Sequence, residues 1–231
     1  MSNISSPSRT GRVLPIVFND NESETRTPAG PLFPIPEIAR DPYGALLPLP
    51  ALRLGGEADL TRIAPGRPQA DGEPILITGR VLDEDLAPVK KLLIEVWNCN
   101  TYGRYSHSDD RANPEAKLDP NFYGFGRILT DDEGRYAVRT IKPAPYIARR
   151  DINWWRPPHV HFSVIGSGLR LVTQMYFQGH PLNEKDFIYM IVPEDERGRV
   201  VGNPSGVQHG DPTYEYDIVV RGRHQTPPDL G

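Results

Sequence analysis

Two histidines stand two positions apart in the stretch WWRPPHVHFSV, residues 154–164, which is otherwise rich in aromatic and β-branched side chains. Such a composition predicts a β-strand, and alternate residues of a strand point to the same face of the sheet. His159 and His161 are therefore expected to point the same way, where two neutral imidazoles can bind one metal ion. The other interpretation is a pair of histidines on a solvated strand face. Arg156 and the two prolines after it form a rigid, extended entry to the pair, which favours a functional site.

A metal ion in a protein needs about three or more ligands, so other residues must complete this site. The remaining histidines, at positions 107, 180, 209 and 224, have no spacing that indicates coordination, and Cys99 is the only cysteine, which excludes a cysteine-based zinc site. Tyr105 in NTYGRYSH and Tyr146 in IKPAPYIARR could supply oxygen ligands. A phenol has a pKa of about 10, so it binds only a cation charged highly enough to ionise it, such as Fe(III). Chemical reasoning alone does not select these two among the ten tyrosines.

The elements that must hold these residues are predicted to be strands. Glycine and proline contribute 21 and 25 of the 231 residues, and proline breaks helix interiors but is tolerated in turns and at strand edges. Short β-rich runs separated by turn signals then predict an all-β sandwich or barrel. The expected strands are 74–82, 89–97, 134–141, 159–165, 170–177 and 214–222, of which the first two are expected to pair as a hairpin around DEDLAP. The long connections 97–134 and 179–212 are expected to carry function or an interface.

Residues 1–65 differ from the rest in being rich in proline and in apolar residues without a clear period. They predict an N-terminal arm, with residues 32–55 packed on the protein's own core or on a partner, and residues 66–231 are expected to form the catalytic domain. The net charge of −4 provides no basic surface for nucleic acid, and no stretch approaches the roughly 18 apolar residues of a membrane span. The single cysteine and the absence of a signal-peptide pattern predict a cytoplasmic protein that binds neither nucleic acid nor membrane.

Four runs in this order and spacing resemble the intradiol ring-cleaving dioxygenases, and within that family the iron-binding β subunits of the protocatechuate branch. They are EVWNCNTYGRYSH, LDPNFYGFGRILTDDEGRYAVRTIKPAPY, INWWRPPHVHFSV and RLVTQMYFQG. The resemblance spans residues 66–222 and implies an all-β sandwich core with long active-site loops. It also implies a partner: an α subunit of the same fold that lacks the iron ligands, or otherwise further copies of the same chain.

The resemblance implies a non-haem Fe(III) site and assigns its residues position by position. Its four protein ligands would be Tyr105, Tyr146, His159 and His161, with hydroxide as a fifth. Tyr105 corresponds to the axial tyrosine that leaves the iron when substrate arrives, and Tyr146 to the one that stays. Arg156 corresponds to a cation that stabilises negative charge on the substrate ring, and Gln174 to a residue lining the pocket for dioxygen and substrate. Trp97 corresponds to an aromatic residue near the pocket, although it is equally compatible with a plain core position.

The implied reaction is cleavage of a catechol between its two hydroxylated carbons by O2, which gives a cis,cis-muconate. Protocatechuate is the expected substrate, with 3-carboxymuconate as the product. The sequence departs from the family pattern at Ile147 and Ala148, where a proline and a large tryptophan are usual, and at Tyr102 and His180. Another substituted catechol, such as 4-sulfocatechol, is therefore an alternative. The proline-rich arm disfavours the catechol and hydroxyquinol branches, which have a helical dimerisation region, although hydroxyquinol stays among the alternatives.

Two alternatives belong to other functional classes. A non-catalytic structural subunit of the same sandwich fold is one, because a fold alone does not specify a function. A hydrolase that binds zinc or another divalent metal through His159 and His161 is the other. Colour separates the metal sites, because ferric tyrosinate absorbs visible light and a zinc protein is colourless.

Overall fold

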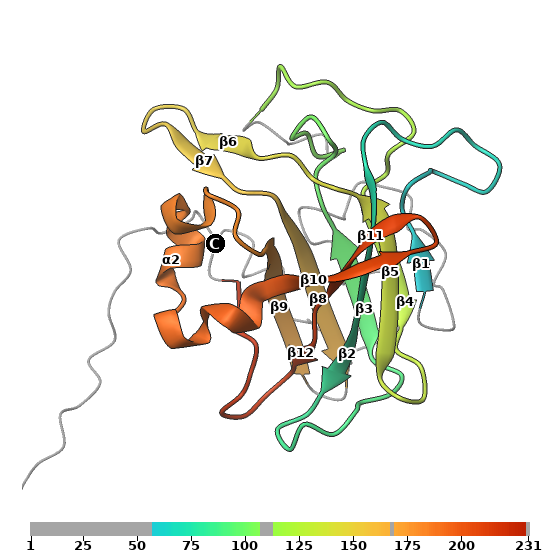
Figure 1. The fold of residues 1–231 in the computed structure, drawn as a ribbon, viewed down its shortest axis with the longest axis vertical. Helices are drawn as coiled ribbons and strands as arrows, with labels where there is room; N and C mark the ends of the chain where they lie inside the picture. The colour runs from blue at the N-terminus through green and yellow to red at the C-terminus, as the bar shows by residue number, and fades with distance from the viewer. Residues whose placement is uncertain (1–56, 107–112, 167–168, 230–231) are drawn as a thin grey trace, which may run out of the picture.

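The computed structural model describes residues 57–106, 113–166 and 169–229, and within them one large sheet and one hairpin account for the strands (Figure 1). The strands are β1 (Glu57–Asp59), β2 (Pro74–Leu82), β3 (Leu93–Trp97), β4 (Phe125–Leu129), β5 (Arg135–Ile141), β6 (Tyr146–Arg149), β7 (Trp154–Arg156), β8 (His159–Gly166), β9 (Leu169–Phe177), β10 (Val201–Gln208), β11 (Asp211–Glu215) and β12 (Ile218–Val219). The helices are the 3₁₀ segments η2 (Asn183–Lys185) and η3 (Glu194–Val200) and the short α-helix α2 (Phe187–Ile191).

The large sheet folds over a single principal core. Its strand order is β1-β5-β2-β11-β10-β9-β8-β3-β4, with β12 attached to β2, and β1 also contacts β4, so the sheet nearly closes on itself. Alternation along β8 directs Val160, Phe162 and Val164 into this core, where each is fully buried. The prediction of an all-β architecture is confirmed, and the opposite face of β8 is left for the histidines.

Most of the expected strands are confirmed, including 74–82, 134–141, 159–165 and 170–177 to within a residue or two. The predicted hairpin between 74–82 and 89–97 is wrong. A tight turn does return the chain as far as a bridge between Leu82 and Pro88, but Lys91 then adopts a left-handed conformation at φ 58° and β3 continues between β4 and β8. Both long sides of β2 are occupied by β5 and β11. Strand β2 therefore pairs with the segment that follows it only at this turn, and β3 pairs with other strands.

One further expectation needs correction. The run 214–222 does not form one strand, because β11 ends at Glu215 and β12 begins at Ile218. The connection 97–134 contains β4, and the connection 179–212 contains both 3₁₀ segments, α2 and β10. Strand β10 has the sequence VGNPSGVQ, whose glycines and proline are unusual in strands, so propensity alone does not indicate it.

The predicted arm, residues 1–65, lies outside the described residues up to position 56, and so does its proposed contact segment 32–55. The described part of the arm includes β1, which pairs in parallel with β5. The boundary at 65/66 stays a prediction. None of the helices in the described part of the chain has the length and apolar character needed to cross a membrane.

Candidate active site

Strand β8 presents the two histidines on the face opposite the core, and its neighbours line up beside them. His161 is opposite Trp97 of β3 on one side and Gln174 of β9 on the other. His159 is opposite Tyr176 of β9. Both histidines are buried, with exposed fractions of 1% and 5%. The interpretation as two histidines on a solvated strand face is therefore wrong.

The hairpin β6–β7 brings two more of the predicted residues together. Tyr146 at the start of β6 pairs directly with Arg156 at the end of β7, and the two prolines after Arg156 lead straight into β8. A register shift between Ile147 and Arg149 leaves Ala148 as the extra residue of a β-bulge. In Figure 1 the hairpin extends beyond the end at which β8 begins, and α2 lies below it.

Tyr105 comes from the loop that follows β3, and this loop is fixed by a side chain. The Asn100 side-chain oxygen accepts hydrogen bonds from the backbone N–H groups of Tyr102 and Arg104, at 2.9 and 3.0 Å. Gly103 completes the turn at φ 75°, a conformation that glycine adopts without strain. Together they direct the Tyr105 ring inward, where it lies edge-on to Tyr146 with ring centroids 5.7 Å apart.

The Tyr105 hydroxyl lies between the two imidazoles. Its oxygen is 3.3 Å from Nε2 of His159 and 3.1 Å from Nε2 of His161. The Tyr146 ring completes the group, with its centroid 5.7 Å from that of His159. The four residues predicted as metal ligands are therefore brought into one cluster.

Hydrogen bonding fixes which nitrogen of His159 is the acceptor. Its Nδ1 is 2.7 Å from the carbonyl oxygen of Pro157. A carbonyl oxygen can only accept, so Nδ1 carries the hydrogen and Nε2 directs its lone pair toward Tyr105. Burial, and then the charge of Arg156, hold the pKa of His159 well below its usual value, which keeps the ring neutral. His159 therefore presents a neutral imidazole with its Nε2 lone pair directed into the cluster.

His161 is held in a similar way by two neighbours. Its ring stacks on Trp97 at a centroid distance of 4.9 Å and an interplanar angle of 2°. Its Nδ1 lies 3.5 Å from a carboxylate oxygen of Asp229, at the outer limit of a hydrogen bond. Burial alone raises the pKa of Asp229, but His161 and Arg156 outweigh this and lower it, so the carboxylate is charged.

The cluster has the donor chemistry of a cation site. The Nε2 lone pair of His159, the Nε2 atom of His161 and the Tyr105 oxygen converge within 3.3 Å, so nitrogen and oxygen donors face one point. Among the described residues no group of three or more histidine, cysteine or acidic side chains could hold a metal ion. A metal at His159 and His161 would therefore need the phenol oxygens, which suit a hard, highly charged cation such as Fe(III).

Arg156 lies behind this cluster in a buried polar network. Its Nη2 donates to the Gln174 side-chain oxygen at 2.5 Å and to the Tyr176 hydroxyl at 3.0 Å. Its Nε and Nη2 also donate to one oxygen of Asp186, at 3.3 and 3.1 Å. Burial lowers the pKa of Arg156, but the negative charge that Tyr176, Tyr146 and Asp186 can carry holds it well above the usual value. The guanidinium stays charged.

Sequence reasoning missed three residues of this region, namely Tyr176, Asp186 and Asp229. Tyr176 could have been inferred, because it lies two positions after Gln174 on the same face of one strand. Asp186 and Asp229 had no usable signal, because each reaches the site from a distant loop or from the C-terminal segment.

The positions where the sequence departs from the pattern of the family it resembles have different surroundings. Ala148 packs against the cluster that contains Trp97, Tyr105 and Tyr146, so it adjoins the candidate site. Tyr102 is more than a third exposed and donates to Asp71 at 2.8 Å, outside the cluster.

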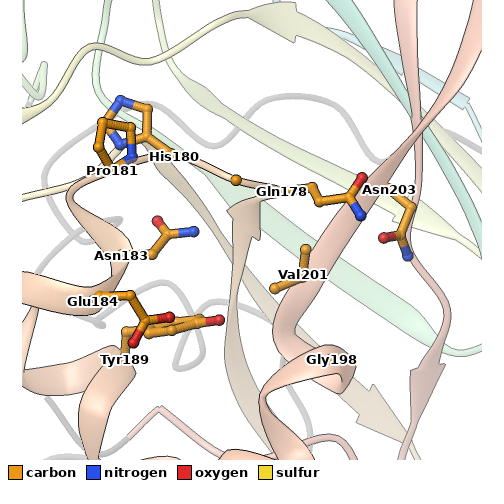
Figure 2. Close-up of a pocket in the computed structure, with 10 residues that line it drawn as sticks. Gln178, His180, Pro181, Asn183, Glu184, Tyr189, Gly198, Val201 and Asn203 are labelled. Carbon is orange, nitrogen blue, oxygen red and sulfur yellow. The ribbon is translucent and has the colours of Figure 1, made fainter.

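His180 lines a separate surface hollow of about 400 Å³ (Figure 2). Figure 2 shows His180 and Pro181 on one side of the hollow and Gln178 and Asn203 on another. None of the residues predicted for the site lines it. Tyr189, which does, makes an edge-on ring contact with Tyr176 at 5.0 Å.

Comparisons with known proteins agree with one another. A family model described as dioxygenase matches residues 50–222. The protocatechuate 3,4-dioxygenase beta chain of Burkholderia cepacia is 46% identical over 211 residues, which cover 89% of this chain and 88% of that protein. The chlorocatechol 1,2-dioxygenase of Pseudomonas sp. (strain P51) is 30% identical over 159 residues, or 64% of this chain and 58% of that protein.

Among solved structures, catechol 1,2-dioxygenase from Pseudomonas arvilla C-1 superposes with a TM-score of 0.56 at 24% identity. The match covers 80% of this chain and 62% of that one. At this identity the likeness supports the fold alone.

Proposed function

Since the chain belongs to the dioxygenase family and is an intradiol ring-cleaving enzyme of the catechol and protocatechuate type, we propose that it cleaves a substituted catechol with O2 at a non-haem Fe(III). The proposed ligands are Tyr105, Tyr146, His159 and His161. The observation that carries this proposal is the position of the Tyr105 hydroxyl, within 3.3 Å of both histidine Nε2 atoms.

Protocatechuate is the proposed substrate. Its support is the 46% identity to a protocatechuate 3,4-dioxygenase beta chain over most of the sequence. Ring opening between the two hydroxylated carbons inserts both atoms of O2 and would give 3-carboxy-cis,cis-muconate. Ala148 favours a second candidate, because a small side chain beside Tyr105 and Tyr146 leaves room for a larger ring substituent. A sulfonate, as in 4-sulfocatechol, is such a group, and hydroxyquinol is a further alternative.

Each proposed role follows from the chemistry of the side chain concerned. When bound, the ferric ion supplies Lewis-acid chemistry that lowers the pKa of catechol hydroxyls. As a phenolate, the Tyr105 oxygen, which lies 3.3 and 3.1 Å from the two imidazoles, would take one of the protons that the substrate loses. Tyr146, anchored in the hairpin opposite Arg156, stays in place and orients the site.

Arg156 is proposed to stabilise the negative charge that develops on the substrate ring. It is buried and permanently charged, so it acts without reorganising solvent, and by analogy with oxyanion donors it contributes about 3–4 kcal/mol toward the transition state. Gln174 accepts from the guanidinium at 2.5 Å and helps to orient it. Replacing Arg156 is expected to lower kcat far more than iron content.

We propose that the chain assembles with a partner of the same fold, because its relative is named as a beta chain. Further copies of this chain are the alternative. The single, buried Cys99 suits a reducing compartment, which supports the cytoplasm as its location.

The deciding experiment measures metal, colour and turnover in one preparation. The purified protein should contain about one iron per chain, absorb visible light through ferric tyrosinate, and consume O2 with protocatechuate. Mass spectrometry after reaction in ¹⁸O₂ should find both labelled atoms in the muconate product. Parallel assays with 4-sulfocatechol, hydroxyquinol and unsubstituted catechol rank the substrates, and light scattering gives the assembly. A colourless zinc protein, or iron-loaded protein inactive on every ortho-diol, would refute the proposal.

A further inference from the structure

Asp186 is a buried carboxylate on which several hydrogen-bond donors converge. It is fully buried, and it lies between η2 and α2, far from the histidine strand in sequence. Its Oδ1 accepts from the Trp154 indole N–H at 3.1 Å and from the backbone N–H of Ile188 at 3.4 Å. Its Oδ2 accepts from the Arg156 guanidinium and from the Tyr176 hydroxyl at 3.1 Å. Nothing in the proposed reaction so far uses this residue.

The surroundings of Asp186 suit a carboxylate and not an amide. The indole, guanidinium and backbone groups that reach it are all donors, and only a carboxylate offers acceptors on both of its atoms. An asparagine would turn its own NH2 group toward at least one of these donors. The negative charge also balances the buried guanidinium, which would otherwise be costly to remove from water.

The network fixes where the guanidinium of Arg156 can point. Nε and Nη2 are held by one oxygen of Asp186, while Nη2 also reaches Gln174 and Tyr176. Any rotation of the planar guanidinium group would break several charge-assisted hydrogen bonds at once. The guanidinium is thereby kept against the Tyr176 hydroxyl, and the Tyr176 ring lies 6.0 Å from the ring of His159. Arg156 itself pairs with Tyr146 in the hairpin.

We propose that Asp186 is a positioning residue for ring cleavage: it aims Arg156 at the substrate ring and joins the η2–α2 segment to the active site. This inference rests on the proposed function, in which Arg156 stabilises charge on the ring. A purely structural role would be limited to capping α2 and neutralising a buried charge. The two roles predict different results when Arg156 is already absent.

The test is a double-mutant cycle on the complete protein with wild type, Asp186→Asn, Arg156→Leu and the double variant. Asparagine is as good a helix N-cap as aspartate, so the cap is retained while the charge is lost. Asp186→Asn is expected to lower kcat about 10- to 100-fold, with little change in KM, iron content or visible absorption. In the Arg156→Leu background the same change should alter kcat by less than about twofold, because residues that act through one another are not additive.

Asp151→Asn is the matched control. Asp151 pairs with Arg149 at 2.6 Å in the β6–β7 hairpin that also carries Arg156, but both side chains are exposed. This variant should keep the wild-type kcat.

The outcomes separate this proposal from the proposed function. Wild-type kcat in folded, iron-loaded Asp186→Asn, or equal losses in both backgrounds, would overturn the positioning role. If Asp186→Asn does not fold, Asp186→Glu decides, because it keeps the charge and shifts the carboxylate by one methylene. About a tenfold loss of kcat with normal iron supports the proposal, and an unchanged kcat overturns it. If the proposed function itself is wrong, the wild-type protein will lack iron or turnover. That result is different from the failure of the positioning role alone.

Discussion

His159 and His161 are both oriented through Nδ1, but their partners differ in kind. His159 is held by a backbone carbonyl of its own segment, two residues before it. His161 depends on Asp229 and on stacking against Trp97, both far away in sequence. A partner on the far nitrogen fixes the ring orientation and raises the basicity of a metal-binding histidine. The two proposed ligands should therefore respond differently to changes elsewhere in the chain.

The histidine pair itself gives the first prediction. His161→Ala should abolish iron binding and visible absorption, because it removes one of the two proposed nitrogen ligands from the cluster. His180→Ala is the matched control: this histidine lines the separate hollow, and its removal should leave iron content unchanged. Metal analysis and absorption spectra check both variants. Full iron loading of His161→Ala would contradict the assigned ligand set.

Asp229 gives the second prediction. Asp229→Ala removes the carboxylate from beside His161 and should speed the loss of iron to a chelator, with a fall in metal affinity of about 10- to 100-fold. The stacking on Trp97 remains, so some binding should survive. The exposed Asp195 of η3 provides the control, and Asp195→Ala should release iron at the wild-type rate. Equal release rates for the two variants would show that Asp229 does not support His161.

Local sequence patterns identified fewer of the candidate site residues than the family resemblance did. Alternation along the strand correctly put His159 and His161 on one face, because strand geometry has a fixed period. Chemical type alone could not choose Tyr105 and Tyr146 among ten tyrosines. Asp186 and Asp229 were beyond sequence reasoning, because their neighbours are set by how distant segments pack.

At the scale of elements, the site depends on how tightly the Tyr105 loop fits against the β6–β7 hairpin. A Cβ atom on Gly103 would lie 2.9 Å from the Tyr146 Cβ and 3.1 Å from the Pro145 carbonyl oxygen. Backbone and Cβ atoms cannot move aside as a flexible side-chain end can. The loop and the hairpin therefore fit together only with glycine at this position.

Gly103→Ala is accordingly expected to separate Tyr105 from Tyr146 and to lower iron content and the tyrosinate absorption. Gly179 is a close control, because its φ of 70° resembles the 75° of Gly103, yet nothing lies within 4 Å of an added Cβ. Gly179→Ala carries only the backbone strain, about 1 kcal/mol of unfolding free energy. Thermal unfolding with metal analysis separates strain from displacement. Similar iron loss in both variants would mean that strain alone disturbs the site.

The sequence predicted most individual strands but not how they pair. Strands such as β2, β5 and β9 carry clear β-branched or alternating patterns, which depend on local geometry. The pairing of β2 with β5 and β11 depends on which edges are left open after distant segments dock. The hairpin expected from DEDLAP failed for that reason, since turn chemistry specifies the turn and not the strands' later partners.

In the molecule as a whole, two buried tyrosines connect distant strands of the large sheet. Tyr136 of β5 donates to the carbonyl oxygen of Tyr216 at 2.5 Å, and both rings pack against Phe162 of β8. Both phenols lie in the principal core, on the opposite face of β8 from the histidines. The stability of the core is therefore linked to keeping these two hydroxyls protonated.

Burial raises the pKa of both Tyr136 and Tyr216 above the usual value of about 10. Because the folded pKa exceeds the unfolded one, their contribution to stability is complete below about pH 10. Above that pH the unfolded chain loses protons that the folded chain retains, so the free energy of unfolding must fall as pH rises. Each phenol contributes a slope of at most about 1.4 kcal/mol per pH unit.

Urea unfolding between pH 8 and pH 11, followed by tryptophan fluorescence, should show a plateau and then this decline. Tyr136→Phe removes one of the two phenols, so its free energy of unfolding should be lower at pH 8 but should decline less steeply above pH 10. The reduced slope, and not the lower starting value, is the diagnostic result, because loss of a hydrogen bond alone shifts the curve without changing its slope. Parallel curves for wild type and Tyr136→Phe would mean that this core phenol does not control alkaline stability.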